Sequence, residues 1–439
     1  MLRVSRMLET LFHMREAGTS VRTEILAGVA TFLTMAYITV MNPNILSDGT
    51  GMEFGAVFTA TIIAAVVGTL IMGLWANWPI ALAPGMGLNA FFTYSVIHGE
   101  GYSYEEALAA VLVSGIAFVI LSVTPARKYI INSIPKSMKL GIGAGIGLFL
   151  AIIGLKGAGV VVDNPATLVG LGDVASWSVL LAGLGFIIMS VLDKRGIPGS
   201  IIIGILAVSV IAWIFGADGS TLGGVVGSVP NPEHAFQLDF NALATAGFIG
   251  IAFSFLFVDF LDTAGTLTSV ANLTGKINAD GEVEDIDRAL LADSSATVIG
   301  ALAGTSSTTS YIESGAGVKE GGRTGLTAVT VAVLFAACLG LAPLAQSVPA
   351  FATAPALIFI ATYFIRNLKD IDWDDVSEYA PAVLAAIVMP LTYNIAYGIA
   401  IGFIAYVITK ALSGKREALN LGTVGIAIVS VLYFVEYSL

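Results

Sequence analysis

Long apolar stretches follow one another along almost the whole chain, and they constrain its fold more than any other feature. A helix of about twenty residues crosses a bilayer, and helices satisfy their backbone hydrogen bonds internally within lipid. We therefore predict an all-α polytopic membrane protein with fourteen transmembrane segments. The predicted spans are 24–45, 54–75, 80–97, 106–125, 136–156, 174–192, 197–216, 244–270, 289–304, 305–318, 323–344, 351–365, 379–392 and 395–412.

Some of these stretches, such as 289–304, 305–318 and 379–392, are short for a full crossing. Short segments interrupted by Gly or Pro are typical of discontinuous transporter helices, and we predict two discontinuous segments. A further apolar stretch, 419–437, follows the last span. The sequence leaves open whether it crosses the membrane, dips into it or lies flat.

The composition argues against several other classes of protein. Charged residues make up 12% of the chain, against ~25% in soluble domains. The single cysteine, Cys338, allows no disulfide within the chain, and the three histidines show no ligand spacing. We therefore expect no metal and no cofactor. The net charge of −11 argues against a nucleic-acid partner.

The Lys and Arg residues gather in loops that fall on one side of the predicted membrane. With fourteen crossings and a cytoplasmic N-terminus, every cluster lies inside and only Lys156 lies outside. This distribution agrees with the positive-inside rule. We predict a multi-pass protein of the cell membrane, surrounded by lipid, with its N-terminus in the cytoplasm.

The two halves of the chain resemble each other weakly but in the same order. APGMGLNAFF (83–92) aligns with STTSYIESGA (307–316), and LTMAYITVMNPNIL (33–46) aligns with FSFLFVDFLDTAGTL (253–267). Seven predicted crossings in each half place the halves in opposite orientation. Such a 7+7 inverted repeat with interrupted helices is typical of alternating-access transporters, whose substrate site lies near the bilayer midplane.

Two carboxylates, Asp262 and Glu313, lie in stretches that otherwise have the composition of membrane interior. A charged side chain at the bilayer centre costs roughly 2.5–3.5 kcal/mol on insertion scales, so such residues are functional by default. We predict that both bind substrate and that both are candidates for proton coupling. The alternative for each is a carboxylate that only bonds a neighbouring helix.

Polar residues around the two carboxylates extend the predicted site. Asp259 precedes Asp262 by three residues, so both can share one helix face, and Asp259 is either a proton carrier or a helper. The amide of Asn89 offers a donor and an acceptor for a heterocycle, although interhelical packing explains it almost as well. Phe91 could stack on a ring or simply pack, and Thr263 could bond its own backbone. The remaining predicted substrate contacts are Asn89, Phe91, Thr263 and Thr309.

The same residues weigh against other functions. Asp259 and Asp262 lie on one predicted helix, whereas an aspartyl protease needs two Asp on separate elements across a scissile bond, so we predict no enzyme. Two carboxylates at the site disfavour an anionic substrate. An anion transporter of the sulfate-permease-like architecture is nevertheless the alternative function.

Four stretches resemble signatures of the AzgA-like purine permeases, which belong to the nucleobase–ascorbate transporter (nucleobase–cation symporter) superfamily. They are MAYITVMNP, APGMGLNAFF, FVDFLDTAGTL and SYIESGAGVKEGGRTGL, and the resemblance covers nearly the whole chain. It implies proton-coupled uptake of adenine, guanine or hypoxanthine by an elevator-like movement, with Asn89, Asp262 and Glu313 on the substrate. The wider superfamily usually has a Glu in the eighth span followed four residues later by an acidic residue or His. Here those positions are Asp262 and Thr266, which leaves the proton carrier open between Asp259, Asp262 and Glu313.

The resemblance also implies a division into two domains. A core domain (24–130 and 244–345) would hold the substrate, and a gate domain (131–217 and 346–413) would form a homodimer. The remaining segments are a cytoplasmic N-terminus (1–23), an extracellular loop (218–243) and a C-terminal hydrophobic segment (414–439).

Overall fold

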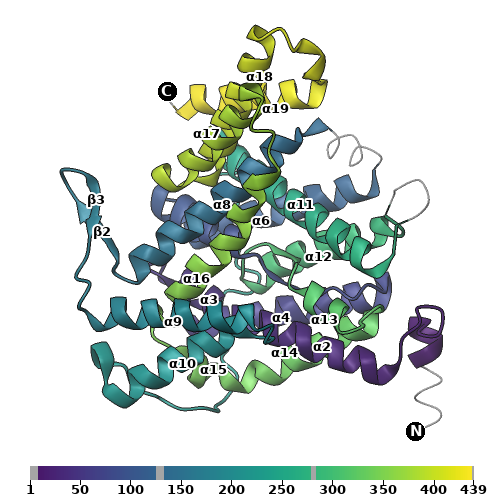
Figure 1. Ribbon diagram of the computed structural model, residues 1–439, viewed down its shortest axis with the longest axis vertical. Helices are drawn as coiled ribbons and strands as arrows, with labels where there is room; N and C mark the ends of the chain where they lie inside the picture. Colours follow the sequence, from purple (N-terminus) through teal and green to yellow (C-terminus); the bar gives the residue numbers. More distant parts are fainter. Residues whose placement is uncertain (1–7, 125–132, 278–282, 438–439) are drawn as a thin grey trace.

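The computed structural model describes residues 8–124, 133–277 and 283–437 (Figure 1). Within these ranges, nine helices are long and apolar enough to cross a membrane, and three further apolar helices are shorter. The chain is therefore a multi-pass membrane protein. The count of fourteen crossings in a 7+7 repeat stays a prediction, because several of the proposed segments are shorter than a full crossing.

The helices and strands account for most of the described chain. The first half contains α2 (Val21–Met35), α3 (Ile38–Ser47), α4 (Phe54–Ile71), β1 (Leu82–Pro84), α5 (Met86–Ala90), α6 (Tyr104–Val123), α8 (Lys136–Gly157), β2 (Val161–Asn164), β3 (Leu168–Leu171), α9 (Trp177–Lys194) and α10 (Ser200–Phe215). The second half contains α11 (Ala246–Thr274), α12 (Ile286–Ala303), β4 (Thr308–Ser310), α13 (Ser314–Lys319), α14 (Gly325–Ala337), α15 (Ala342–Gln346), α16 (Ala350–Ile365), α17 (Val376–Thr392), α18 (Ile395–Leu412) and α19 (Leu421–Tyr437).

Side-chain hydrogen bonds fix where many of these helices begin. Ser20 accepts from the backbone N–H of Thr23 at the start of α2. Ser103 and Glu106 form a reciprocal capping box at the start of α6. Because the first N–H groups of a helix have no partner within the helix, such caps satisfy donors that would otherwise be unpaired at the ends of the spans.

The segments at 80–97 and 305–318 each contain a short strand followed by a short helix. β1 leads into α5, which continues directly as a π-helix over Phe91–Gly99, and β4 leads into α13. The two strands pair antiparallel, with Ala83 opposite Thr309, and all their residues are buried. Extended backbone inside a membrane needs external hydrogen-bond partners, and here each strand provides them for the other. The pairing therefore brings the two halves of the chain together at one point.

The helices form two packing groups. In the first, α12 packs on α4 and α6, α14 packs on α2 and α4, and α11 packs on α6 and α13. In the second, α8 packs on α16 and α17, α9 packs on α10 and α16, and α17 packs on α18. The division of the chain into a core and a gate domain stays a prediction. Their roles as moving and static bodies stay a prediction.

Two elements lie at the edge of the molecule in Figure 1. The hairpin of β2 and β3 projects away from the helices on the left of the view. The last helix, α19, lies near the top and packs against both α18 and α11. The stretch at 419–437, whose position the sequence left open, is thus a helix in contact with both packing groups.

Candidate functional site

The polar centre of the molecule surrounds β4. Asp293, on α12, is fully buried and holds this strand with one oxygen. Its Oδ1 accepts hydrogen bonds from the backbone N–H of Ser310 at 2.6 Å and from the Ser310 hydroxyl at 2.5 Å. Its Oδ2 accepts from the Thr263 hydroxyl of α11 at 2.8 Å. One carboxylate thus ties together α11, α12 and β4.

Asp259 lies on the same buried side of α11, with only 1% of its surface exposed. Its Oδ2 accepts a hydrogen bond from the Thr297 hydroxyl at 2.7 Å, and that hydroxyl is also 3.0 Å from the Thr308 carbonyl oxygen. The Thr309 side chain lies close to the carboxylate. Within the described part of the chain, its Oδ1 has no hydrogen-bond partner of normal geometry. Asp259 is therefore part of the buried polar interior around β4.

A cavity of about 510 Å³ lies between α11 of the first packing group and α8 and α16 of the second. Asp262 lines it, and it is the only acidic residue among the described residues of the wall. The rings of Tyr363 and Phe364 belong to the same wall, together with the apolar side chains of Ile146 and Ile312. This volume is in the range of small-molecule sites, which combine a mostly apolar lining with a few polar groups. Asp259 and Asp262 were predicted to share one face of the helix. Of the two, only Asp262 lines this cavity, whereas Asp259 bonds Thr297.

Glu313 immediately precedes α13 and is half-buried. Its Oε1 accepts a hydrogen bond from the Tyr37 hydroxyl at 2.8 Å, and Tyr37 lies at the break between α2 and α3. Glu313 does not itself line the cavity, although its neighbour Ile312 does. The carboxylates of Asp262 and Glu313 nevertheless interact electrostatically. The structure thus has Asp262 on the cavity wall and Glu313 next to the wall residue Ile312, bonded to Tyr37.

The other predicted substrate contacts are engaged elsewhere in this conformation. The Asn89 amide is fully buried: its Nδ2 donates to the Pro84 carbonyl oxygen at 3.3 Å, and its Oδ1 accepts from the Ser306 hydroxyl. Phe91 is fully buried and packs edge-on against Phe255. Four predicted substrate contacts are absent from the described residues that line the cavity: Asn89, Phe91, Thr263 and Thr309.

Thr263 and Thr309 form part of the buried hydroxyl network around β4. Their hydroxyl oxygens are 2.9 Å apart, and Thr263 also donates to Asp293. The sequence-based alternative for Thr263, a bond to its own backbone, is therefore not what the structure has. Thr268, by contrast, does donate to the carbonyl of Ala264 in its own helix.

Sequence reasoning missed Asp293 although the signal was present. Asp293 is a carboxylate within the predicted span 289–304, and the rule applied to Asp262 and Glu313 covers it equally. Tyr37 gave no such signal, because a tyrosine in an apolar stretch is unremarkable until its partner is known.

Comparisons with known proteins complete the description of the site. A family model described as the Permease family matches residues 22–401. The adenine permease AdeP of Escherichia coli (strain K12) is 40% identical over 430 residues, covering 98% of this chain and 96% of that protein. The guanine/hypoxanthine permease PbuO of Bacillus subtilis (strain 168) is 43% identical over 436 residues, covering 97% of this chain and 99% of that protein.

A solved structure shares the fold at lower identity. The transmembrane domain of BicA, a cyanobacterium bicarbonate transporter, matches with a TM-score of 0.66 at 18% identity, covering 88% of this chain and 97% of that chain. At this identity the likeness concerns the fold alone.

Proposed function

The chain belongs to the Permease family and is a membrane transporter rather than an enzyme, and on this premise we propose that it takes up purine nucleobases. The proposed substrates are adenine, guanine and hypoxanthine, the bases named for the similar permeases. The observation that carries the proposal within the chain is the position of Asp262, a carboxylate on the wall of a largely apolar cavity of about 510 Å³.

The chemistry of this cavity suits a flat, neutral heterocycle. Purine N–H groups are hydrogen-bond donors, and a carboxylate such as Asp262 accepts hydrogen bonds with both of its oxygens. The rings of Tyr363 and Phe364 on the wall offer faces on which a base could stack. Glu313, oriented by the Tyr37 hydroxyl, supplies a second acceptor beside the cavity.

The proposed mechanism is an elevator-like movement of the first packing group past the second. The cavity lies between the two groups, so such a movement would open it on one side of the membrane and then on the other. In this scheme the first group is the core and the second is the gate, which we propose also forms a homodimer. We place the protein in the cell membrane, with a cytoplasmic N-terminus.

The coupling ion in this proposal is a proton carried by a carboxylate of the site. Asp262 lines the cavity, and Glu313 directly follows Ile312, which also lines it, so both carboxylates are candidates. Asp259 is the third candidate, and it is buried against Thr297 behind the cavity wall. The pH profile of uptake in single variants distinguishes between them.

A competition assay tests the function. Cells producing the protein take up radiolabelled adenine, guanine or hypoxanthine, with unlabelled purines, pyrimidines, sulfate and bicarbonate as competitors. We expect purines alone to compete and an uncoupler to reduce uptake. Anion transport is the alternative. The fold shared with BicA and the Lys139 side chain on the cavity wall are compatible with it, whereas the Asp262 carboxylate on the same wall opposes it. Inhibition by bicarbonate or sulfate but not by purines would overturn the proposal in favour of that alternative.

Variants of the site residues test the assignments. Glu313→Gln should abolish uptake while the protein remains folded in the membrane, whereas Glu320→Gln, at an exposed position on the same segment, should not. Asp262→Asn should weaken purine affinity or change the pH profile of uptake. Asn89→Ala should alter which purine is preferred. An unchanged competition profile would instead assign Asn89 to packing, in line with its bond to Ser306.

A further inference from the structure

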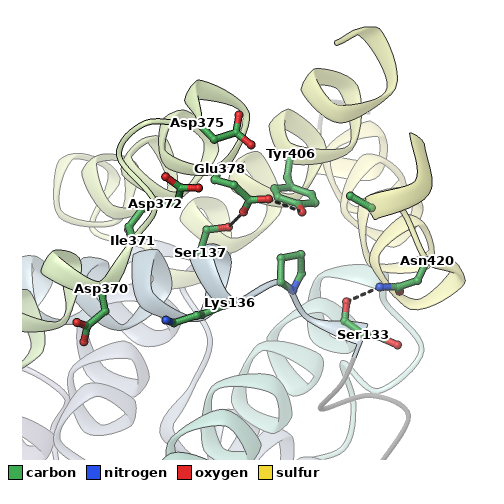
Figure 2. A pocket seen from close by; sticks show the side chains of 12 residues that line it. Ser133, Lys136, Ser137, Asp370, Ile371, Asp372, Asp375, Glu378, Tyr406 and Asn420 are labelled. Carbon is green, nitrogen blue, oxygen red and sulfur yellow. Dashed lines mark hydrogen bonds between the residues drawn. The ribbon is translucent and has the colours of Figure 1, made fainter. Parts of the chain in front are cut away.

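The first turn of α19 is attached to the connection between α6 and α8. The Asn420 side chain donates a hydrogen bond from Nδ2 to the carbonyl oxygen of Ser133 at 2.9 Å (Figure 2). The Thr423 hydroxyl donates to the same oxygen at 2.7 Å. Asn420 also caps the helix, since its Oδ1 accepts from the Thr423 backbone N–H at 2.9 Å. We call this contact, formed by Ser133, Asn420, Gly422 and Thr423, the α19 anchor.

The absence of a side chain at Gly422 allows this close approach. A Cβ atom there would lie 2.6 Å from the Ser133 Cβ, closer than atoms can approach without displacement. Three residues further along the same helix, a Cβ at Gly425 would have no atom within 4 Å. Of these two glycines, only Gly422 faces Ser133. A substitution at Gly425 is therefore a matched control for one at Gly422.

The anchor is buried at Ser133 and Thr423, and it adjoins open space at Asn420. A polar cavity of about 450 Å³ adjoins it, lined among others by Ser133, Lys136, Glu378 and Asn420 (Figure 2). The two hydrogen bonds and the close approach of Gly422 fix the position of α19 at this end, in addition to the apolar contacts of Leu419 and Ile426.

The position of α19 relates it to both packing groups. Ser133 follows α6 of the first group and precedes α8 of the second, with 125–132 outside the described residues. The body of α19 packs on α18, which belongs to the second group, and also on α11, which carries Asp262. Any displacement of α11 along α8 and α16 must change its contact with α19.

We propose that α19 is a brake on the movement of the first packing group, an inference that rests on the proposed elevator-like function. The contact with α18 fixes α19 to the second group. The α19 anchor fixes its first turn to Ser133, which lies just before α8 of that group. The helix then holds α11 in the arrangement described here. Weakening the anchor frees α19 and lowers the population of this arrangement relative to the alternative one.

Distance measurements between spin labels test the brake directly. In a Cys338→Ala background, nitroxides are attached at Lys319→Cys in the first group and Lys194→Cys in the second; both positions are exposed. Pulsed electron–electron double resonance measures the distance between the two labels in nanodiscs, with and without each purine. The distance distribution then gives the populations of the two arrangements. Thr423→Val removes one of the two hydrogen bonds to Ser133. Because one net hydrogen bond is worth a factor of about fivefold in an equilibrium, we expect this variant to lower the ratio of the described arrangement to the alternative one by about fivefold. Gly422→Ala, whose Cβ would lie 2.6 Å from the Ser133 Cβ, should lower the same ratio.

Matched variants separate the brake from general damage. Gly425→Ala makes the same chemical change on the same helix without touching Ser133, and Thr423→Ser keeps the hydroxyl donor; both should retain the parent ratio. If Gly422→Ala fails to accumulate in the membrane, Thr423→Val, which adds no clash, carries the test. Parent-like ratios in Gly422→Ala and Thr423→Val overturn the brake.

The same data show separately whether the proposed function fails. Two distances that respond to purines in the parent support the elevator-like movement whatever the variants do. A single distance in the parent and in every variant, with or without purine, overturns both the movement and the brake. A second distance that emerges only in Gly422→Ala and Thr423→Val supports the brake.

Discussion

Replacement of Asp293 tests whether this carboxylate positions β4. In Asp293→Ala, the Ser310 N–H loses its acceptor, and the Ser310 and Thr263 hydroxyls lose theirs. A buried donor left without a partner costs about 1–3 kcal/mol. The N–H is fixed by the strand and bears that cost in full, whereas the hydroxyls can rotate toward other acceptors. We therefore expect a loss of about 2–4 kcal/mol in the free energy of unfolding.

Asp293→Asn should be much milder because the amide can keep the network. Its Oδ1 can accept both bonds from Ser310, and its Nδ2 can donate to the Thr263 hydroxyl, which then donates to Thr309. What it loses is the charge, and charged hydrogen bonds are about twice as strong as neutral ones. We expect about 1 kcal/mol of destabilisation.

Thermal unfolding of the purified protein in detergent measures these differences. Asp285→Asn is the matched control, since it makes the same change at an exposed position just before α12 and should have little effect. Asp293→Ala should also lose purine uptake, because a displaced β4 moves the residues that follow it. Equal destabilisation by Ala and Asn, or a stable Ala variant with normal uptake, would refute the hydrogen-bond argument.

Three further variants examine other contacts. Tyr37→Phe removes the 2.8 Å bond to Glu313 and should raise the KM for purine uptake by about tenfold, the equivalent of ~1.4 kcal/mol; an unchanged KM would show that Glu313 needs no such orientation. Lys410 is 2% exposed and has two partly exposed carboxylate partners, so Lys410→Met should lower the free energy of unfolding by about 1–3 kcal/mol. Lys415 is 51% exposed, so Lys415→Met should lower it by less than about 1 kcal/mol. Glu24→Ala removes a fully buried acceptor for N–H groups at the start of α14 and should lower the melting midpoint; a midpoint equal to that of the parent would contradict this role.

The sequence identified residues whose chemistry conflicts with their surroundings. Asp262 and Glu313 were singled out because a charge in an apolar stretch needs an explanation. In the structure Asp262 lines a cavity, and Glu313 follows the cavity residue Ile312. That argument needs no knowledge of tertiary contacts. It could not decide which of Asp259 and Asp262 faces the cavity, because residues three apart on a helix are displaced only slightly around its axis. The packing of the neighbouring helices decides it, because α8 lines the cavity with Asp262 and Thr297 of α12 bonds Asp259.

Long-range pairings lay beyond the sequence for a different reason. The interruptions near Pro84 and in the Ser/Thr-rich run before Glu313 were visible, but the pairing of β1 with β4 depends on how the surrounding helices pack. Asn89 is a case where this matters. Its amide was assigned to the substrate, yet its bond to Ser306 comes from the segment leading into β4. An Asn that binds a ligand and an Asn that bonds other parts of the protein cannot be told apart from the sequence.

The arrangement around β4 explains how a buried carboxylate can affect a cavity that it does not line. Asp293 holds Ser310 through both the backbone N–H and the hydroxyl, and Glu313 follows Ser310 by three residues. The Tyr311 hydroxyl donates to the Pro84 carbonyl oxygen at 2.5 Å, which secures the intervening turn to β1. The position of Glu313 relative to Asp262 is thus fixed by hydrogen bonds on the far side of the strand. A change in charge or geometry at Asp293 should therefore reach the cavity by displacement of the backbone, and its effect on purine affinity should diminish in a Glu313→Gln background.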